Sequence, residues 1–241
     1  HAGTAALRIG ADASGSWFDG LIDEVRVSSA DKSATLGETT TDYLYNARNQ
    51  LTTETCGDSV KTYSYDKNGN VTKIAEVVGA TTIGTEEMYY DQLNRMTSYD
   101  GPRGKESFTY RGAQWHRFSQ TALGTATSFL YDGDNVVGDY QGGSLSAEYV
   151  TPFLDQNLSI TTGGSTYYYS QDGLGSVRTL TDSSGTLKNT YDYLPFGSPL
   201  AAGTSVEVSQ RYTYTGREDN PVSSLMYYRY RHYDPRIGRF S

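Results

Sequence analysis

The chain has 241 residues and a formal net charge of -8, because 28 Asp plus Glu outnumber 20 Lys plus Arg. This acidic balance argues against nucleic acid as the main partner, since phosphate binding rests on a basic surface. The single cysteine, Cys56, excludes an intrachain disulfide and a thiolate metal site. No apolar run approaches the ~18 residues of a membrane helix, so no transmembrane segment is expected.

The first thirty residues predict two strands, at residues 7–10 and 18–27, joined by a small polar loop. In the second strand Leu21, Val25 and Val27 fall on one face, as the two-residue period of a strand requires. Residues 31–41 are polar and poor in bulky apolar side chains, so we interpret them as a linker.

From residue 42 onward the chain carries an internal repeat with the pattern Y-[DN]-x-x-[NG]-x-apolar. The tyrosine ends a strand, the Asp or Asn opens a turn, and the Asn or Gly at the fifth position tolerates positive φ. The pattern therefore predicts hairpin turns at residues 46–50, 66–70, 91–95 and 132–136. The residues that define the four copies are Tyr45 with Asn49, Tyr65 with Asp66 and Gly69, Tyr90 with Asp91 and Asn94, and Tyr131 with Asp132 and Asn135.

Aromatic residues recur two apart, and residues two apart in a strand share a face. We therefore expect these pairs to line one side of a continuous sheet built from hairpins lying side by side. As core packing the rings need no ligand; the alternative is that exposed rings stack on sugars. The eight pairs are Tyr43/Tyr45, Tyr63/Tyr65, Phe108/Tyr110, Phe129/Tyr131, Tyr167/Tyr169, Tyr191/Tyr193, Tyr212/Tyr214 and Tyr228/Tyr230.

Four longer motifs follow the repeats. They are DGLGSVR at 172–178 with Gly175, YDYLPFG at 191–197 with Pro195 and Gly197, YTGRE at 214–218 with Arg217, and the stretch at 225–241 with Tyr233, Asp234, Pro235 and Gly238. Together with the repeats they resemble the YD repeats and the Rhs-associated core of Rhs proteins, which are related to teneurin and Tc-toxin shells. The resemblance covers residues 42–241, although His232 stands where the family usually has Tyr. One residue that usually precedes the final Ser is also missing, since Ser241 follows Phe240 directly.

The resemblance implies an all-β fold in which antiparallel hairpin repeats form a spiralling β-sheet strip, part of a hollow shell. Residues 1–30 resemble the end of a LamG or concanavalin-like jelly-roll domain, on the motif at 20–27. The implied function is a structural shell segment of a secreted or cell-surface bacterial protein, enclosing or presenting a C-terminal toxin cargo of the same polypeptide. The alternative is an adhesion module that binds cell-surface glycans.

Self-cleavage is not expected of this chain. In the family, the region beyond the core can hold an aspartyl autoprotease that uses paired Asp-Pro segments. This sequence contains Asp234-Pro235 alone, so we interpret the core as truncated at its C-terminal end. A carboxylate pair is needed for one acid to hold a proton while the other acts as base. No catalytic residue is therefore assigned.

Three further features have ordinary structural interpretations. The Gly173-x-Gly175 segment lacks the third Gly of a nucleotide fingerprint, and residues 66–70 and 132–135 lack the later ligands of a calcium loop. Each is better explained as a turn, so no cofactor and no metal is predicted. Residues 211–239 hold six Arg against three acids, and we expect these Arg to pair with nearby carboxylates and carbonyls rather than form a basic patch.

Overall fold

The computed structural model describes residues 40–241. Within this part of the chain the only helices are two short 3-10 turns, η1 (Ala201–Gly203) and η2 (Tyr214–Gly216), and the remaining regular structure is β. The all-β prediction is confirmed. The predicted strand pair at 7–10 and 18–27 and the linker up to residue 39 lie outside the described residues. β1 begins at Thr41, the last residue of that predicted linker.

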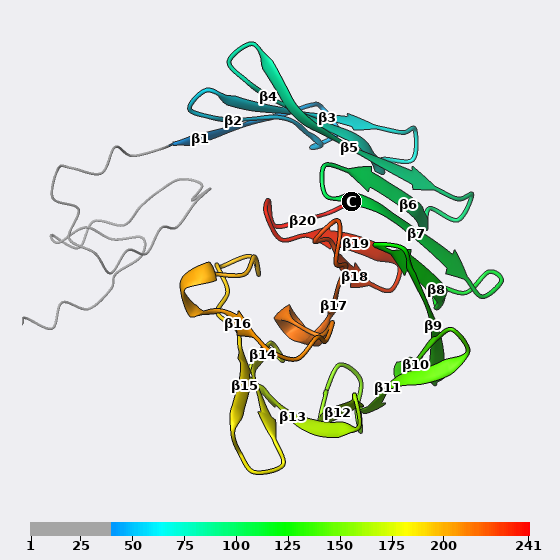
Figure 1. Ribbon diagram of the computed structural model, residues 1–241. Helices are drawn as coiled ribbons and strands as arrows, with labels where there is room; N and C mark the ends of the chain where they lie inside the picture. The colour runs from blue at the N-terminus through cyan, green and yellow to red at the C-terminus, as the bar shows by residue number, and fades with distance from the viewer. Residues whose placement is uncertain (1–39) are drawn as a thin grey trace, which may run out of the picture. The chain divides into compact units, whose positions relative to one another are not determined.

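Sixteen strands form one antiparallel sheet in which every strand pairs with the next along the chain. The strip curves through a wide arc (Figure 1). Its strands are β1 (Thr41–Tyr45), β2 (Leu51–Cys56), β3 (Ser59–Tyr65), β4 (Val71–Val78), β5 (Thr81–Tyr90), β6 (Met96–Gly101), β7 (Gly104–Tyr110), β8 (Arg117–Ala122), β9 (Thr125–Asp132), β10 (Asn135–Gln141), β11 (Ser144–Val150), β12 (Ser159–Thr162), β13 (Ser165–Gln171), β14 (Val177–Asp182), β15 (Leu187–Thr190) and β16 (Ser205–Val206).

The strip ends at Val206, so the aromatic pairs beyond it, Tyr212/Tyr214 and Tyr228/Tyr230, are not part of the continuous sheet expected for them. Residues 207–241, called the C-terminal segment below, contain a separate four-stranded antiparallel sheet. This small sheet lies within the arc of the strip (Figure 1). Its strands are β17 (Glu218–Asp219), β18 (Met226–Tyr228), β19 (Arg231–Asp234) and β20 (Arg239–Phe240).

The repeat turns share one local geometry. In the turn at 66–70 the Asp66 carboxylate accepts the backbone N–H groups of Asn68 and Asn70, each at 2.9 Å. Gly69, at the fifth position of the repeat, has a φ of 94°. Asn49 and Asn94 have φ of 58° and 60°, a region that Asn tolerates because its side chain bonds locally. The side chain that opens the turn and the residue that reverses it are thus both set by the repeat pattern.

The copy at Tyr131 departs from this geometry. β9 runs through Asp132 and β10 starts at Asn135, so the loop is only two residues long. Positive φ falls on Gly133, at 57°, and not on Asn135, which corrects the prediction for the fifth position. Gly at the first loop position adopts positive φ without a Cβ clash and closes a tighter hairpin. The side-chain amide of Asn135 instead donates to the Thr151 carbonyl at 3.3 Å.

A ladder of tyrosine hydroxyls joins successive repeats. Four tyrosines, among them Tyr65 and Tyr90 of the repeat pattern, each reach back and donate to the carbonyl of the first residue of the strand that follows the preceding turn. Such a bond contributes about 0.5–1.5 kcal/mol and fixes the distance between neighbouring hairpins. The four bonds are Tyr65 to Leu51 (2.7 Å), Tyr90 to Val71 (3.0 Å), Tyr110 to Met96 (2.7 Å) and Tyr193 to Val177 (2.7 Å).

The concave side of the strip holds the core. One buried cluster gathers around Leu51, Met88 and Phe108 with Leu225 of the C-terminal segment. A second gathers around Phe129, Leu180 and Tyr191 with Tyr212. Apolar rows of the strip are therefore covered by the C-terminal segment, and burial of this surface is the main favourable contribution to the fold.

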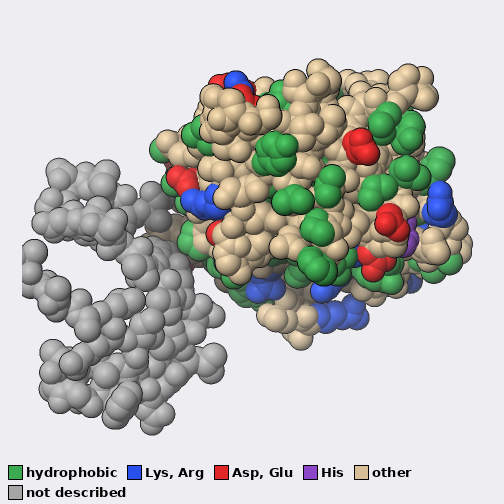
Figure 2. Space-filling view, turned by 90° about the horizontal axis from the view of Figure 1, so that it is seen from below, with side chains coloured by type: hydrophobic (Ala, Val, Ile, Leu, Met, Phe, Trp, Pro, Cys, Tyr) green, Lys and Arg blue, Asp and Glu red, His purple; other side chains and the backbone are tan. Residues whose placement is uncertain are grey.

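The aromatic pairs divide into two groups. Pairs such as Tyr63/Tyr65 and Phe108/Tyr110 line the concave side, as expected. Tyr43 and Tyr45 of β1 belong to the strip but are largely exposed, whereas Tyr212/Tyr214 and Tyr228/Tyr230 belong to the C-terminal segment and do not line the strip. On the face shown in Figure 2, apolar side chains stand singly or in small groups among polar ones, which is normal for a protein surface.

Candidate functional site

The candidate functional site is the contact between the concave side of the strip and the C-terminal segment. The strip supplies mainly carboxylates and the C-terminal segment supplies guanidinium groups. This arrangement agrees with the expectation that the Arg of residues 211–239 pair with carboxylates and carbonyls. The ion pairs across the contact are Arg211–Asp139 (2.6 Å), Arg236–Glu86 (2.6 Å), Arg229–Asp155 (2.7 Å) and Arg217–Asp155.

Arg117 of β8 is an exception, because here the strip supplies the cation and the C-terminal segment supplies the carboxylate. It is fully buried and donates to Glu218 at 2.6 Å and to Asn220 at 2.8 Å. Its guanidinium also lies 3.9 Å from the ring centre of Tyr227. Burial alone would raise the pKa of Glu218, but Arg117 and Arg211 hold that pKa below its ordinary value. Glu218 is therefore an anion at neutral pH that joins the strip to the C-terminal segment.

A second carboxylate, Glu106 of β7, anchors the start of the small sheet. It accepts the backbone N–H of Val222 and, at 3.0 Å, the hydroxyl of Ser223. Burial and the negative charge of Glu106 raise the pKa of Asp219 to about 7. Burial raises the pKa of Glu106 as well, so this part of the contact holds two neighbouring acids whose pKa values both lie above their ordinary values.

Asp155 is the centre of the contact at the loop between β11 and β12. It has a φ of 62° and accepts hydrogen bonds from both Arg217 and Arg229. Gly216 lies so close that a Cβ there would meet the Asp155 carbonyl oxygen at 2.5 Å. The TGRE motif therefore needs its Gly for close approach and its Arg for the ion pair.

The motifs of the C-terminal half meet one another around this loop. The backbone N–H of Thr215 donates to the Ser176 hydroxyl, and the N–H of Val177 donates to the Thr213 carbonyl, both at 3.0 Å. Gly175 has a φ of 81°, and a Cβ added there would lie 3.8 Å from the backbone of Thr215. Residues 172–178 and 214–218 are thus two halves of one contact.

Close packing and hydrogen bonds also join residues 191–197 to the C-terminal segment. Gly197 and Gly238 both have positive φ, and a Cβ on either would strike a ring, of Tyr214 and of Phe196 respectively. Tyr233 donates its hydroxyl to the Phe196 carbonyl at 3.0 Å, and Tyr214 donates to that of Pro195 at 3.2 Å. Pro195 and Pro235 each lie in one of the two turns that face each other here.

Asp234 is held by a neighbouring cation. Its carboxylate accepts from Arg236 at 2.8 and 2.9 Å, and Arg236 also bonds Glu86 of β5. Asp234 is therefore part of an ion-pair chain between the C-terminal segment and the strip. The expectation that it does not act in self-cleavage stays a prediction.

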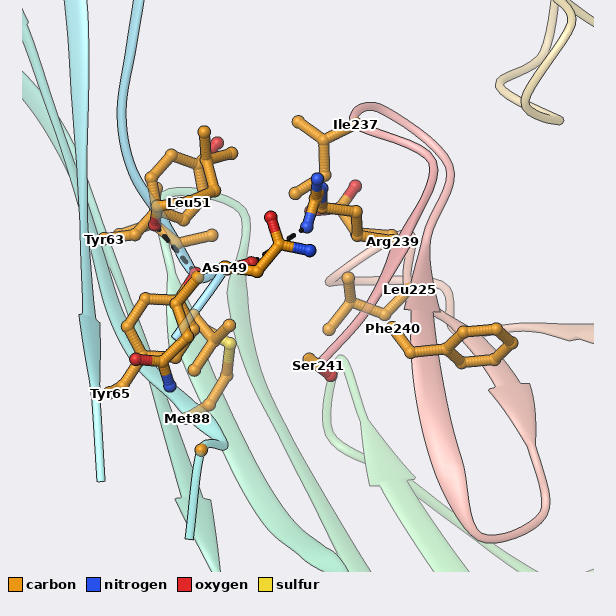
Figure 3. Close-up of a pocket in the computed structure, with 15 residues that line it drawn as sticks. Asn49, Leu51, Tyr63, Tyr65, Met88, Leu225, Ile237, Arg239, Phe240 and Ser241 are labelled. Atoms are coloured by element: carbon orange, nitrogen blue, oxygen red, sulfur yellow. Dashed lines mark hydrogen bonds between the residues drawn. The ribbon is translucent and has the colours of Figure 1, made fainter. Parts of the chain in front are cut away.

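A cavity of about 120 Å³ lies where the last residues meet the first repeats (Figure 3). Leu51, Tyr63 and Met88 point into it from the strip, and Leu225 and Ile237 point into it from the C-terminal segment. Arg239 closes one side by donating to the Asn49 carbonyl at 3.3 Å. The lining is mixed, with nearly as much polar as apolar surface, and within residues 40–241 no group of three His, Cys, Asp or Glu is placed to hold a metal ion.

Several residues of this contact have no place in the repeat pattern. Glu106, Asp139 and Asp155 were not identified because each is a single acid in an ordinary polar stretch. Arg117 carries a usable signal: it is the first residue of β8, where β2, β4 and β6 begin with Leu, Val and Met. A charged residue in a buried apolar position indicates a buried partner.

An antiparallel strip that curves around its own C-terminal segment defines a class of protein, the β-sheet shell. A family model described as "Teneurin YD-shell" matches residues 20–129. The chain is 31% identical over 202 residues to the tRNA3(Ser)-specific nuclease WapA of Bacillus spizizenii, and 29% identical over 202 residues to the tRNA nuclease WapA of Bacillus subtilis. Each match covers 81% of this chain and 8% of the relative.

The fold is also found in a solved structure, TcdB2-TccC3 without its hypervariable C-terminal region. That match has a TM-score of 0.50 and 16% identity, and it covers 83% of this chain and 14% of the other. With the repeats and motifs described above, these findings show that the chain belongs to the YD-repeat shell proteins of the Rhs type. It spans about 8% of the length of the WapA relatives.

Proposed function

We propose that this chain is a wall segment of a shell that encloses a C-terminal toxin cargo carried on the same polypeptide. The observation that carries the proposal is the position of the C-terminal segment. Ion pairs and buried side chains hold it against the concave side of the strip, and Ser241 lies within the arc (Figure 1). A domain joined after Ser241 would therefore begin on the concave side.

In this proposal the toxic activity belongs to the cargo, and the chain itself is not an enzyme. The carboxylates at the contact support this assignment, because Glu86, Asp155 and Glu218 are each engaged by arginine. The names of the WapA relatives describe tRNA nucleases, which favours a nuclease as the cargo. We expect the purified chain to have no activity on tRNA and the parent protein to be active in the same assay.

We further propose that the parent protein is secreted or displayed on a bacterial surface. Within residues 40–241 the structure has no helix of the length and apolar character that would cross a membrane. Detection of the parent protein in culture supernatant or on intact cells, by antibody, tests this placement. Confinement to the cytosol throughout growth contradicts it.

Protease protection tests the enclosure. A specific protease site is placed directly after Ser241 in the parent protein, and cleavage is followed over time. We expect slow cleavage in the folded parent and fast cleavage in the variant Arg117→Met, which loosens the contact. Equal rates in the folded parent and in a denatured control contradict enclosure.

The alternative function, an adhesion module that binds glycans, stays a prediction. The side chains that could stack on a sugar are the exposed rings of Tyr89, Tyr168 and Tyr230. Binding to a defined glycan on an array, lost when one of these Tyr is replaced by Ala, would favour it over the enclosure of cargo.

A further inference from the structure

The tyrosine ladder is interrupted at Tyr131. By the rule of the other repeats its hydroxyl would bond the carbonyl of Arg117, the first residue of β8. That bond is not made. The Arg117 side chain donates to Asn220 and Glu218 of the C-terminal segment. Within the described residues the buried Tyr131 hydroxyl has no hydrogen-bond partner. An unsatisfied buried hydroxyl costs about 1–3 kcal/mol, so the break needs compensation.

The Tyr131 hydroxyl is one of several unpartnered polar atoms around one small cavity. Tyr131, Thr151, Asn157 and Arg229 all line it. Each has a buried atom without a protein partner in the described part of the chain: Tyr131 Oη, Thr151 Oγ1, Asn157 Oδ1 and Arg229 Nε. Asn157 is only 4% exposed, so bulk solvent does not supply the missing bond. Four residues that line one cavity and each carry a buried atom without a protein partner point to a shared ligand.

The chemistry of the four atoms selects the ligand. Arg229 Nε can only donate, Asn157 Oδ1 can only accept, and the two hydroxyls can do either. A cation would meet the guanidinium groups of Arg217 and Arg229, and an anion would meet the Asn157 oxygen beside the Asp155 carboxylate. A molecule that both donates and accepts satisfies all four.

The size of the cavity sets the number of molecules. It offers about 20 Å³ to the centre of a water-sized sphere. One water needs roughly 10–15 Å³ by the same measure and makes two to four hydrogen bonds. The geometry points to one internal water that accepts from Arg229 Nε and a hydroxyl and donates to Asn157 Oδ1. This water takes the place of the missing ladder bond and joins the repeats to the loop at 151–158 and to the C-terminal segment.

A high-resolution crystal structure of the chain, with a parallel bromide soak, tests the site. We expect one density peak within hydrogen-bonding distance of both Tyr131 Oη and Asn157 Oδ1, without anomalous signal. An empty cavity, a direct bond from Tyr131 to a protein carbonyl, or an anomalous bromide peak overturns the proposal.

Matched variants separate the water from general packing. Tyr131→Phe removes one partner of the water, so its density is expected to weaken or vanish. Tyr110→Phe removes a ladder bond of the same kind elsewhere and is expected to leave the density unchanged. If Tyr131→Phe fails to fold, Thr151→Val removes another partner from the same cavity and is expected to have the same effect. Density that is unchanged in Tyr131→Phe or Thr151→Val contradicts the assignment.

Discussion

Arg117 and Glu218 are 101 residues apart in the sequence, yet the guanidinium donates to the carboxylate at 2.6 Å with both side chains buried. The pair crosses from the strip to the C-terminal segment. It is surrounded by the rings of Phe108, Phe129 and Tyr227, which exclude water and strengthen the attraction. Removing one partner of such a pair leaves an uncompensated buried charge.

Replacement of Arg117 by Met is therefore expected to lower the free energy of unfolding by about 3–5 kcal/mol. Urea denaturation followed by circular dichroism measures the change. Lys105→Met is the control, because Lys105 pairs with Asp100 at the surface and its side chain is 78% exposed. We expect the control to unfold at the wild-type midpoint, since an exposed pair contributes little. Equal midpoints for both variants would contradict the role given to Arg117.

The tyrosine ladder predicts a graded response to loss of hydroxyl groups. Tyr65→Phe, Tyr90→Phe and Tyr110→Phe each remove one bond to a strand carbonyl and are expected to cost about 0.5–1.5 kcal/mol. Tyr45→Phe is the matched control, because Tyr45 is 44% exposed and its hydroxyl makes no such bond among the described residues. Thermal unfolding of the four variants, side by side, shows whether the ladder stabilises the strip.

Gly216 is expected to resist substitution for two reasons. It has a φ of 68°, and a Cβ would meet the Asp155 carbonyl oxygen at 2.5 Å. Gly185 also has positive φ, 82°, but a Cβ there meets no atom within 4 Å. Gly185→Ala should cost about 1–2 kcal/mol from backbone strain alone. Gly216→Ala should cost clearly more, and a chemical denaturation series that finds the two equal would contradict the close approach.

The raised pKa of Asp219 predicts that the free energy of unfolding depends on pH. Burial, with the charge of Glu106, raises the pKa of Asp219 to about 7 in the folded chain, above the ordinary value of 3.8. Between these two values the folded state holds a proton that the unfolded state has lost, so this group makes stability fall as pH rises through that window. The effect is at most about 4 kcal/mol.

The variant Asp219→Asn isolates that contribution. It stays neutral at every pH, so it should match the wild type below about pH 4 and become increasingly the more stable of the two as the pH rises toward 8. Melting temperatures of both proteins across this range give the difference. A constant offset between the curves, or a gap that widens toward low pH, contradicts the raised pKa.

Local patterns in the sequence predict the strip well. Tyr65, Asp66 and Gly69 act within one turn, and their chemistry is complete within five residues. The turns opened by Asp172 and Asp182 have the same carboxylate bonds but follow Gln and Thr, so the tyrosine pattern missed them as repeat copies. Loosening the first position of the pattern would have found both.

The path of the C-terminal segment could not be predicted in the same way. Tyr212/Tyr214 and Tyr228/Tyr230 have the same two-residue spacing as the pairs of the strip, and spacing says nothing about which sheet a strand joins. What separates them is contact with residues about a hundred positions away, such as Glu106 with Val222 and Ser223. Those contacts depend on shape and charge, which leave no period in the sequence.

Neighbour-by-neighbour pairing of the strands has a consequence for biosynthesis. An array held only by adjacent hairpins can assemble hairpin by hairpin as it leaves the ribosome. The C-terminal segment, which is made after the strip, nevertheless reaches back to its first strands, from Arg239 to Asn49 and from Arg236 to Glu86. The strip of a nascent chain therefore stays uncovered, exposed to chaperones and proteases, until residues 207–241 emerge and pack against it.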